Sequence, residues 1–414
     1  MSRFLIFGAN YAPEPLGNAP YTTAYAETLV RHGHRVTVVA GYTHYPQWTA
    51  SQRQMRVRVT EEGGVRLVRV PHAVPRVPDA LGRLRLEATF GLAAMGGWIR
   101  GGVRADAVIG VLPTLSGGLA ARVAGAVLRR PTGILVQDLL SAVAAQAGVA
   151  GASDSVARAV GLVERLVLRG TRVAVVARGF EAPVLACGAR EAVYLPNFTT
   201  LPSTVHRDRR ETRMRLGIPP EAFLVTYSGS LGYKQDFANV IAAGKRWAAA
   251  SDIWLLVVGE GGQQALVQEA FASGSLRGRW LPLQPAEEVP DVLAASDLLL
   301  APQRPTDVDM AIPSKLTAYF ASGRPVVAAA SAASETARQV EESGGGLVVA
   351  PGDHEALAEA VLALREDGAQ RARMGAAGAA YARDAFDRAR AEARFVAWAE
   401  ALVARRPYRD PGLA

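Results

Sequence analysis

The sequence predicts an α/β fold with two doubly wound halves, each a mainly parallel β-sheet covered by helices on both faces. Two observations lead to this fold class. The chain of 414 residues is too long for one hydrophobic core and fits two domains of ~200 residues each. Short apolar runs alternate with helix-like stretches, and this alternation stops near residue 200 and then starts again. We expect the two halves to face each other across a cleft that holds the ligand.

The first half opens with an apolar run at 4–7, which we predict to be a buried strand, followed by a loop rich in Gly, Pro and Asn. A helix is expected over 21–31 and a second strand over 36–39. Later apolar runs, separated by alanine-rich stretches, occupy 106–109, 133–136 and 173–176. Strand, crossover helix and strand in repetition is the pattern of a parallel sheet.

The segment 197–215 interrupts this rhythm with Thr, Pro and Ser and with a charged run, so we place the domain boundary at residue 200. Five apolar runs then repeat the pattern, at 224–227, 254–258, 297–300, 325–328 and 346–349. The last predicted helix, 387–405, is expected to pack on a domain surface through Phe395, Val396, Trp398, Leu402 and Val403.

The composition narrows the classes of function. A net charge of +8 favours anionic partners, either phosphate-bearing ligands or acidic lipid. We expect no nucleic acid, because the arginines form no basic stripe studded with aromatic residues. The single cysteine, Cys187, excludes an internal disulfide and suits a cytoplasmic protein. No signal peptide and no apolar run of ~20 residues is visible.

Three loops could bind a phosphate. The first, 8–18, links a strand to a helix, so amides near Gly17 can point at an anion, although the loop could also be only a tight turn. It is not a proper G-x-G-x-x-G, and we infer no NAD site. In the second, Gly229 and Gly232 let the backbone approach a phosphate that Lys234 can neutralise. The spacing differs from that of a P-loop.

The third loop is the most informative. Pro313, Ser314 and Lys315 open a predicted helix, with Ser314 as a candidate N-cap. Free amides, the helix dipole and the lysine would converge on one spot, which suits a diphosphate. The alternative is an ordinary capped helix.

Two side chains of the first half are further candidates. Asp138 follows a strand, where a carboxylate can accept a hydrogen bond from a sugar hydroxyl, act as a base, or cap the next helix. His44 also follows a strand and could touch an acceptor, although a loop histidine is more often merely exposed.

Taken in order, these loops resemble glycosyltransferase family 4, the retaining enzymes of the GT-B fold. The resemblance rests on short motifs that cover most of the chain: Asn10-Tyr11-x-Pro13-Glu14, Gly17, His44-Tyr-Pro-Gln-Trp48, Val136-Gln-Asp138, Tyr227-Ser-Gly-Ser-Leu-Gly-x-Lys234, Pro313-Ser-Lys315 and Ala321-Ser-Gly-Arg-Pro325. The Tyr-Pro-x-Trp and Pro-Ser-Lys elements are similar to the branch that builds colanic-acid-type exopolysaccharides.

The resemblance implies two Rossmann-like domains, an acceptor-binding one over 1–200 and a nucleotide-sugar-binding one over 201–385, with a helix and tail over 386–414 that can cross back to the first. The residues it implies for the donor are Gly229, Ser230, Gly232, Lys234, Leu283, Gln284, Pro313, Ser314 and Lys315. Those it implies for the acceptor are Glu14, Asn18, His44 and Gln137, and those for catalysis are Lys234, Asp138 and Gly17.

The implied reaction is an internal-return substitution in which the leaving diphosphate helps to deprotonate the acceptor. It needs charge stabilisation more than a carboxylate pair. We therefore expect no metal and no cofactor, with a UDP- or GDP-linked sugar as substrate.

The sequence departs from the family pattern at several positions. Met310 and Ala318 stand where the family has two glutamates, of which the second usually grips the ribose. Ser230 replaces an arginine and Gln137 a histidine. The donor nucleotide is therefore left open.

We expect a lipid-linked or oligosaccharide acceptor and a peripheral contact at the inner face of the cytoplasmic membrane. The reason is the stretch 76–104, in which Leu81, Leu84, Leu86, Phe90, Trp98 and Ile99 alternate with Arg83, Arg85, Arg100 and Arg104. These apolar residues could instead pack on the first sheet. Two other functions remain open: a sugar-nucleotide epimerase, which would need facing carboxylates, and a non-catalytic protein that binds nucleotide sugar.

Overall fold

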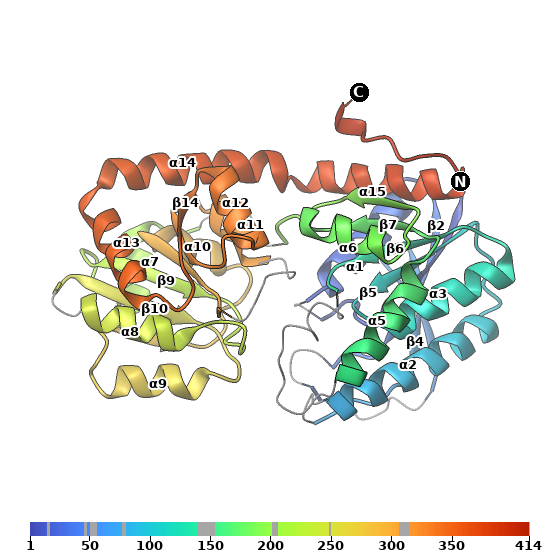
Figure 1. Cartoon of the computed structure of the whole chain (residues 1–414), viewed down its shortest axis with the longest axis horizontal. Helices are drawn as coiled ribbons and strands as arrows, with labels where there is room; N and C mark the ends of the chain where they lie inside the picture. The colour runs from blue at the N-terminus through green and yellow to red at the C-terminus, as the bar shows by residue number, and fades with distance from the viewer. Residues whose placement is uncertain are drawn as a thin grey trace. The chain divides into compact units, whose positions relative to one another are not determined.

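The computed structural model describes residues 1–14, 17–44, 48–49, 56–76, 80–139, 154–200, 206–247, 250–305 and 314–413. The chain divides into two compact units (Figure 1). Unit 1 comprises residues 1–197 and 388–414, and unit 2 comprises 198–387. The division therefore falls three residues before the boundary expected at residue 200, and the C-terminal segment groups with unit 1.

Unit 1 is built on an eight-stranded sheet in the order β3-β4-β2-β1-β5-β6-β7-β8. Its strands are β1 (Arg3–Phe7), β2 (Arg35–Gly41), β3 (Arg58–Glu62), β4 (Val65–Val70), β5 (Ala107–Leu112), β6 (Thr132–Val136), β7 (Arg172–Val175) and β8 (Glu191–Tyr194). All neighbours run parallel except β3, which is antiparallel to β4. The central strands read as continuous apolar runs because both faces of the sheet are covered.

The helices of unit 1 lie on both faces of this sheet. They are α1 (Ala19–Arg31), α2 (Ala80–Arg100), α3 (Leu115–Leu128), α5 (Asp154–Leu168), α6 (Glu181–Ala186) and α15 (Arg388–Val403). The chain moves from β1 to β2 in one direction and from β5 to β6 in the other. Because such crossovers are right-handed, α1 and α3 cover opposite faces. Figure 1 shows α2, α3 and α5 side by side on the α3 face.

Helix α15 packs on unit 1 next to α1. The rings of Tyr25 and Phe395 stack with centroids 4.2 Å apart, and the Arg31 guanidinium lies 2.6 Å from the Glu392 carboxylate. The expected apolar residues of this helix are buried, apart from Val403, which is partly buried. The prediction that this helix packs on a domain surface is confirmed.

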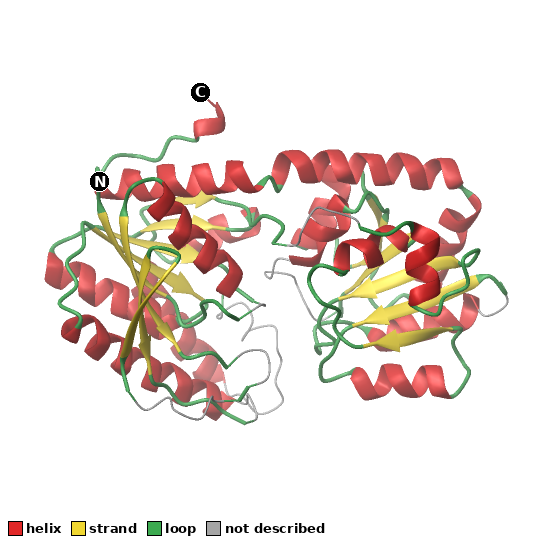
Figure 2. Cartoon of the chain, turned by 180° about the vertical axis from the view of Figure 1, so that it is seen from behind, coloured by secondary structure: helices red, strands yellow, loops and turns green. Residues whose placement is uncertain are grey.

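Unit 2 is built on a six-stranded, fully parallel sheet in the order β11-β10-β9-β12-β13-β14, seen from behind in Figure 2. Its strands are β9 (Phe223–Ser228), β10 (Ile253–Val258), β11 (Gly278–Leu281), β12 (Leu298–Pro302), β13 (Val326–Ala329) and β14 (Gly346–Val349). The helices are α7 (Arg209–Arg215), α8 (Phe237–Trp247), α9 (Gln264–Ala272), α10 (Val289–Ala295), α11 (Ser314–Ala321), α12 (Glu335–Ser343), α13 (His354–Glu366) and α14 (Gly368–Ala385).

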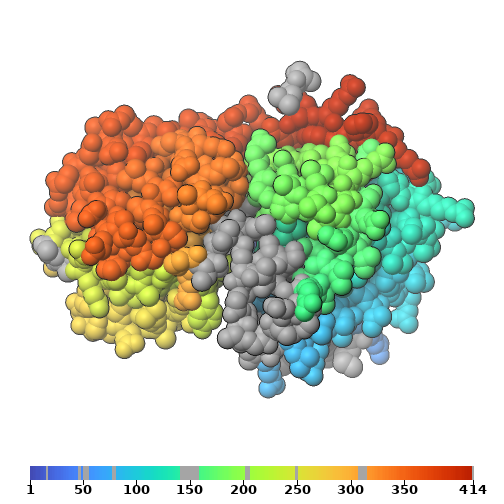
Figure 3. Space-filling view, in the orientation of Figure 1, coloured from blue at the N-terminus to red at the C-terminus, as the bar shows by residue number. Residues whose placement is uncertain are grey.

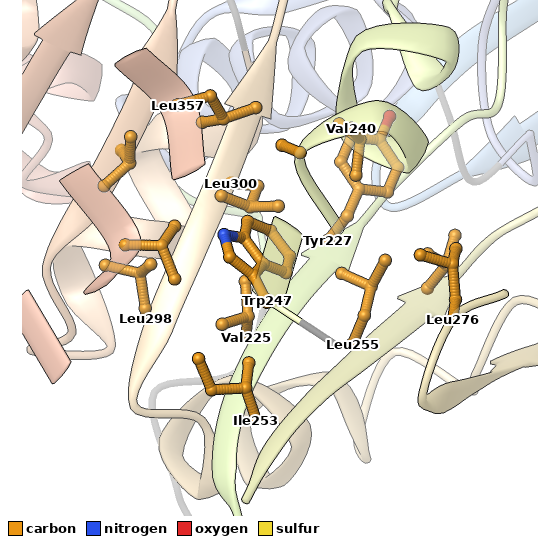
Figure 4. Close-up of a cluster of buried hydrophobic side chains, with 14 of the residues drawn as sticks. Val225, Tyr227, Val240, Trp247, Ile253, Leu255, Leu276, Leu298, Leu300 and Leu357 are labelled. Atoms are coloured by element: carbon orange, nitrogen blue, oxygen red, sulfur yellow. The ribbon is translucent and has the colours of Figure 1, made fainter. Parts of the chain in front are cut away.

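The core of unit 2 fixes the position of β9. Figure 4 shows Val225 and Tyr227 of this strand packed among Trp247, Leu255 and Leu300, all of which are almost fully buried. Because β9 is held from both sides, the loop that leaves its carboxyl end starts from a rigid point.

Candidate active site

The direction in which the chain adds strands to the sheet of unit 2 reverses between β9 and β12. The next strand after β9 along the chain is β10 on one side, whereas β13 follows β12 on the other side. Crossovers that diverge in this way leave a crevice at the carboxyl ends of the two central strands, which is where open α/β sheets bind ligands. The predicted phosphate loop 229–234 leaves β9 at this point.

Two glycines shape this loop and its neighbour after β10. Gly229 has φ +147° and Gly259 has φ +154°, a conformation that residues with a side chain rarely adopt. A Cβ on Gly259 would lie 1.9 Å from the Gly229 carbonyl oxygen. The Gly229 amide donates to the Val258 carbonyl at 2.9 Å and the Leu231 amide to the Glu260 carbonyl at 2.8 Å. The two loops are therefore locked together through their backbones.

Gly232 differs from these two glycines. Its φ is not in the left-handed region, and a Cβ there would meet only the Ser230 hydroxyl, at 3.5 Å. Packing within the described part of the chain therefore does not explain the glycine. A bare backbone at this position leaves space for a ligand to approach.

The loop carries a group of amides that have no hydrogen-bond partner among the described residues. These are the N–H groups of Ser230, Gly232, Tyr233 and Lys234. The side chain of Lys234 is exposed and likewise makes no hydrogen bond or ion pair within the described ranges. Unpaired amides beside a cation are the ordinary components of a phosphate site.

The second lysine, Lys315, approaches the same loop from α11. Its Nζ donates to the Tyr227 hydroxyl at 3.0 Å and to Gln235 Oε1 at 2.6 Å, and it lies 4.4 Å from the centre of the Tyr227 ring. The Tyr227 hydroxyl in turn donates to the Ser230 carbonyl at 2.5 Å. Burial, followed by the neighbouring Tyr319, holds the pKa of Tyr227 well above its ordinary value, so the phenol stays neutral.

Two further side chains, which gave no signal in the sequence, hold the loop. Gln263 is buried and donates from Nε2 to the carbonyls of Gly232 and Gln235, at 2.7 and 2.8 Å. The Tyr319 hydroxyl accepts from the Ser228 amide at 2.9 Å and donates to its carbonyl at 3.0 Å. Neither residue carries a motif of its own, because a Gln just before a helix or a Tyr on a helix gives no sign of its distant partner.

The remaining donor candidates are placed as follows. Leu283 and Gln284 come directly after β11, at the same edge of the sheet, and Leu283 is 38% exposed. Ser314 is the first residue of α11, and only its backbone is described. Pro313 and Met310 lie outside the described residues. Ala318 is half-buried on α11.

In unit 1 the predicted acceptor residues also follow the carboxyl ends of strands. Glu14, which is 5% exposed, accepts from Asn10 Nδ2 at 2.7 Å and from the His44 amide at 2.8 Å. Its carboxylate therefore joins the loop after β1 to the loop after β2. His44 is 6% exposed, which contradicts the alternative that it is merely an exposed loop histidine.

Two further side chains at these loops, His72 and Arg69, were missed. The rings of His44 and His72 meet edge to face with centroids 4.8 Å apart. Burial first, and His44 second, lower the pKa of His72. Arg69 is buried, and its guanidinium donates to the Gly41 carbonyl at 2.8 Å and to the Ala12 carbonyl. A single arginine within β4 and a single histidine just after it gave no sequence signal.

Gln137 and Asn197 form a pair beside Asp138. Asn197 Nδ2 donates to Gln137 Oε1 at 2.8 Å, whereas Gln137 Nε2 and Asn197 Oδ1 are buried and have no partner in the described structure. Unbonded polar atoms of this kind are costly and uncommon. Asp138 is half-buried and accepts from the Leu139 amide at 3.0 Å.

Gly17 and Asn18 stand at the start of α1. Gly17 has φ +69°, and the Asn18 side chain accepts no hydrogen bond from the first turn of the helix. Asn18 therefore does not cap the start of α1 with its side chain. Within the described ranges, no three His, Cys, Asp or Glu side chains come together in a position to hold a metal ion.

Comparison with known proteins agrees with this architecture. Residues 17–198 match the glycosyl transferase 4-like domain, and residues 208–381 match glycosyl transferases group 1. The chain is also 30% identical over 372 residues to the colanic acid biosynthesis glycosyl transferase WcaI of Escherichia coli K12. That match covers 86% of this chain and 90% of the relative. The chain belongs to glycosyltransferase family 4.

Solved structures show the fold of this family 4 glycosyltransferase. Sucrose-phosphate synthase of Thermosynechococcus elongatus superposes with a TM-score of 0.78 at 17% identity, covering 98% of this chain and 100% of that one. HepE of Anabaena, in complex with UDP-glucose, superposes with a TM-score of 0.68 at 18% identity and the same coverage. The predicted GT-B class and the two α/β domains are confirmed, and the cleft between the domains stays a prediction.

Proposed function

We propose that this glycosyltransferase moves a sugar from a nucleotide-diphosphate donor to a lipid-linked saccharide, with retention of configuration, in cell-surface polysaccharide synthesis. The observation that carries the proposal is the group of unpaired amides at Ser230, Gly232, Tyr233 and Lys234 beside the exposed Lys234 ammonium. In this proposal the group binds the donor diphosphate, with the start of α11 and Lys315 completing the site.

Charge stabilisation is the main task of such a site. As the bond between the anomeric carbon and the diphosphate oxygen breaks, negative charge grows on the leaving diphosphate. Fixed amides and a lysine meet that charge without having to reorganise, and removing one such donor typically lowers the rate ~10²–10³-fold. Lys234→Ala is accordingly expected to abolish transfer while leaving the fold intact.

Retention requires the acceptor oxygen to attack the face that the diphosphate leaves. The new bond forms between the acceptor oxygen and the anomeric carbon, and the acceptor proton passes to an oxygen of the departing diphosphate. No metal is needed in this scheme, because two lysines and the loop amides neutralise the leaving group. Metal independence is part of the proposal.

Unit 1 would supply the acceptor side. The unbonded Gln137 Nε2 and Asn197 Oδ1 offer a donor and an acceptor to sugar hydroxyls, and Asp138 lies next to them in the chain. We propose that Gly17 and Asn18, at the start of α1, approach the transferred sugar. Glu14 then acts through His44, whose loop it positions.

The nucleotide of the sugar donor is proposed from the comparisons and not from the site residues. The family glutamate that grips the ribose is replaced by Ala318, so ribose contacts must come from elsewhere. The HepE complex contains UDP-glucose, and we propose UDP-sugars before GDP-sugars. The relation to WcaI, whose name assigns it to colanic acid biosynthesis, supports a role in exopolysaccharide synthesis. A location at the inner face of the cytoplasmic membrane is part of the proposal.

One experiment separates this function from its two rivals. The protein is incubated with UDP- and GDP-sugars and a lipid-linked acceptor, and both the free nucleotide and the sugar nucleotides are analysed. A transferase releases UDP or GDP and forms an α-linked product from an α-linked donor. An epimerase interconverts sugar nucleotides without releasing nucleotide, and a non-catalytic binder does neither; either result would overturn the proposal.

A further inference from the structure

The outer faces of three helices in unit 1 carry exposed aliphatic side chains. They are Leu81, Leu84, Leu92 and Ile99 on α2, Val123 and Val127 on α3, and Leu162 and Leu166 on α5, with exposures from 46% for Val123 to 78% for Leu92. On each helix their spacing of three, four, seven or eight residues places them along one stripe. Figure 3 shows all three helices at the surface of unit 1.

These side chains are not core residues that happen to be partly exposed. The opposite face of α2 is already anchored by Leu86, Phe90 and Trp98, which are at most 8% exposed. Phe90 and Trp98 pack in the core beneath α2. The apolar residues of the stretch 76–104 therefore divide between two faces, one on the sheet and one facing outward.

The exposed charges among the described side chains of α2, α3 and α5 have one sign. Exposed arginines on or directly after the three helices are Arg83, Arg85, Arg100, Arg129, Arg158, Arg165 and Arg169. Arg130 is also exposed but lies 4.0 Å from the Asp106 carboxylate. The carboxylates described on these helices point elsewhere: Glu164 is 1% exposed, and Glu87 is bonded to the Ser116 amide and hydroxyl at the start of α3. Among the described side chains of α2, α3 and α5, no carboxylate is exposed.

We propose that this three-helix surface docks unit 1 on an anionic bilayer, with the leucines at the acyl boundary and the arginines among the headgroups. Aliphatic side chains among cations, without an exposed carboxylate, match that surface in both polarity and charge. Helix α2 alone offers a stripe about 30 Å long. No described helix is long and apolar enough to span a bilayer. The inference deepens the proposed function, because it brings the enzyme to its lipid-linked acceptor.

The test is sedimentation of the full-length protein with vesicles at low salt. Vesicles of phosphatidylcholine alone are compared with vesicles containing about one third phosphatidylglycerol. We expect binding to the anionic vesicles only. The triple variant Arg83→Glu, Arg85→Glu, Arg100→Glu should weaken it at least about tenfold, and so should Leu84→Ser, Leu92→Ser, Ile99→Ser.

Matched controls lie on other surfaces. The triple Lys245→Glu, Arg373→Glu, Arg383→Glu makes the same change in net charge at exposed positions of unit 2 and should bind as the wild type does. Met214→Ser with Leu266→Ser is the apolar control. Equal binding of the α2 variants and the wild type, or equal binding to neutral vesicles, would overturn the proposal.

The alternative to a bilayer on this surface is a second copy of the chain, and the oligomeric state distinguishes the two. A wild-type dimer that the leucine variant converts to monomer would assign the surface to a second copy of the chain and overturn the membrane proposal. Donor binding is measured separately by calorimetry without vesicles. A wild type that binds a donor but no anionic vesicles contradicts only the docking surface, whereas a wild type that binds anionic vesicles but no donor contradicts only the proposed function.

Discussion

Lys315 and Tyr227 are joined by a hydrogen bond of 3.0 Å from the lysine Nζ to the phenolic oxygen. Tyr227 also donates to the Ser230 carbonyl, so the phenol connects α11 to the loop after β9. Tyr227→Phe removes both bonds but keeps the ring in the core. We expect it to lower the free energy of unfolding by about 1–3 kcal/mol and to weaken UDP or GDP binding several-fold. Denaturant titration and calorimetry measure the two effects, and unchanged nucleotide affinity would argue against this connection.

Two glycine substitutions distinguish a structural glycine from a ligand-facing one. Gly259→Ala places a Cβ 1.9 Å from the Gly229 carbonyl oxygen and should lower the melting temperature strongly. In Gly232→Ala the new Cβ contacts only the Ser230 hydroxyl. The melting temperature should therefore stay the same or rise slightly, while nucleotide affinity falls. A Gly232→Ala variant that melts early, or that binds nucleotide as the wild type does, would contradict the assignment.

His72 predicts a pH dependence of stability. Burial lowers the pKa of His72 in the folded chain, whereas the unfolded chain binds a proton near pH 6.5. Above about pH 6.5 His72 is neutral in both states and costs no stability. Below that pH the unfolded chain takes up a proton that the folded chain does not, so the free energy of unfolding falls. We expect His72→Gln to lose less stability than the wild type between about pH 8 and pH 5. The measurement is the free energy of unfolding of each protein as a function of pH. An equal fall in both proteins between these pH values would contradict the prediction.

Asp297 anchors the amino ends of the strands in unit 2. Its carboxylate pairs with Arg209 and with Arg213, whose side chain is 3% exposed. Asp297→Ala leaves a buried guanidinium without its carboxylate. We expect it to lower the free energy of unfolding, measured by denaturant titration, by about 3–5 kcal/mol. Asp252→Ala is the control, because its ion pair with Arg365 is partly exposed to solvent and is expected to contribute only about 1 kcal/mol or less to the free energy of unfolding. A smaller loss for Asp297→Ala than for the control would refute this account.

The sequence predicted the strands with continuous apolar runs and missed four others. β4 and β11 carry arginines within their short runs, and β3 and β8 are polar or half-buried, so none reads as a buried parallel strand. The fold class was still predictable, because the central strands are covered on both faces and read as nearly continuous apolar runs.

From the sequence, the site could be predicted only where its residues lie close together in one loop. Gly229, Gly232 and Lys234 share one loop, and their types alone indicate a phosphate site. Lys315 was found from the helix start, yet its bonds to Tyr227 and Gln235 join segments 80 or more positions apart. The support from Gln263, Tyr319, Arg69 and His72 likewise depends on tertiary packing, which no spacing in the sequence encodes.

The most direct test of the central claim is calorimetric titration of the wild type, Lys234→Ala and Lys245→Ala with UDP and GDP. The chain has three lysines, and Lys245 is an exposed one on α8, so it is the matched control. The account predicts one nucleotide site in the wild type, unchanged affinity in Lys245→Ala and at least about tenfold weaker binding in Lys234→Ala. Equal affinity in all three proteins, or no binding of either nucleotide to the wild type, would contradict it.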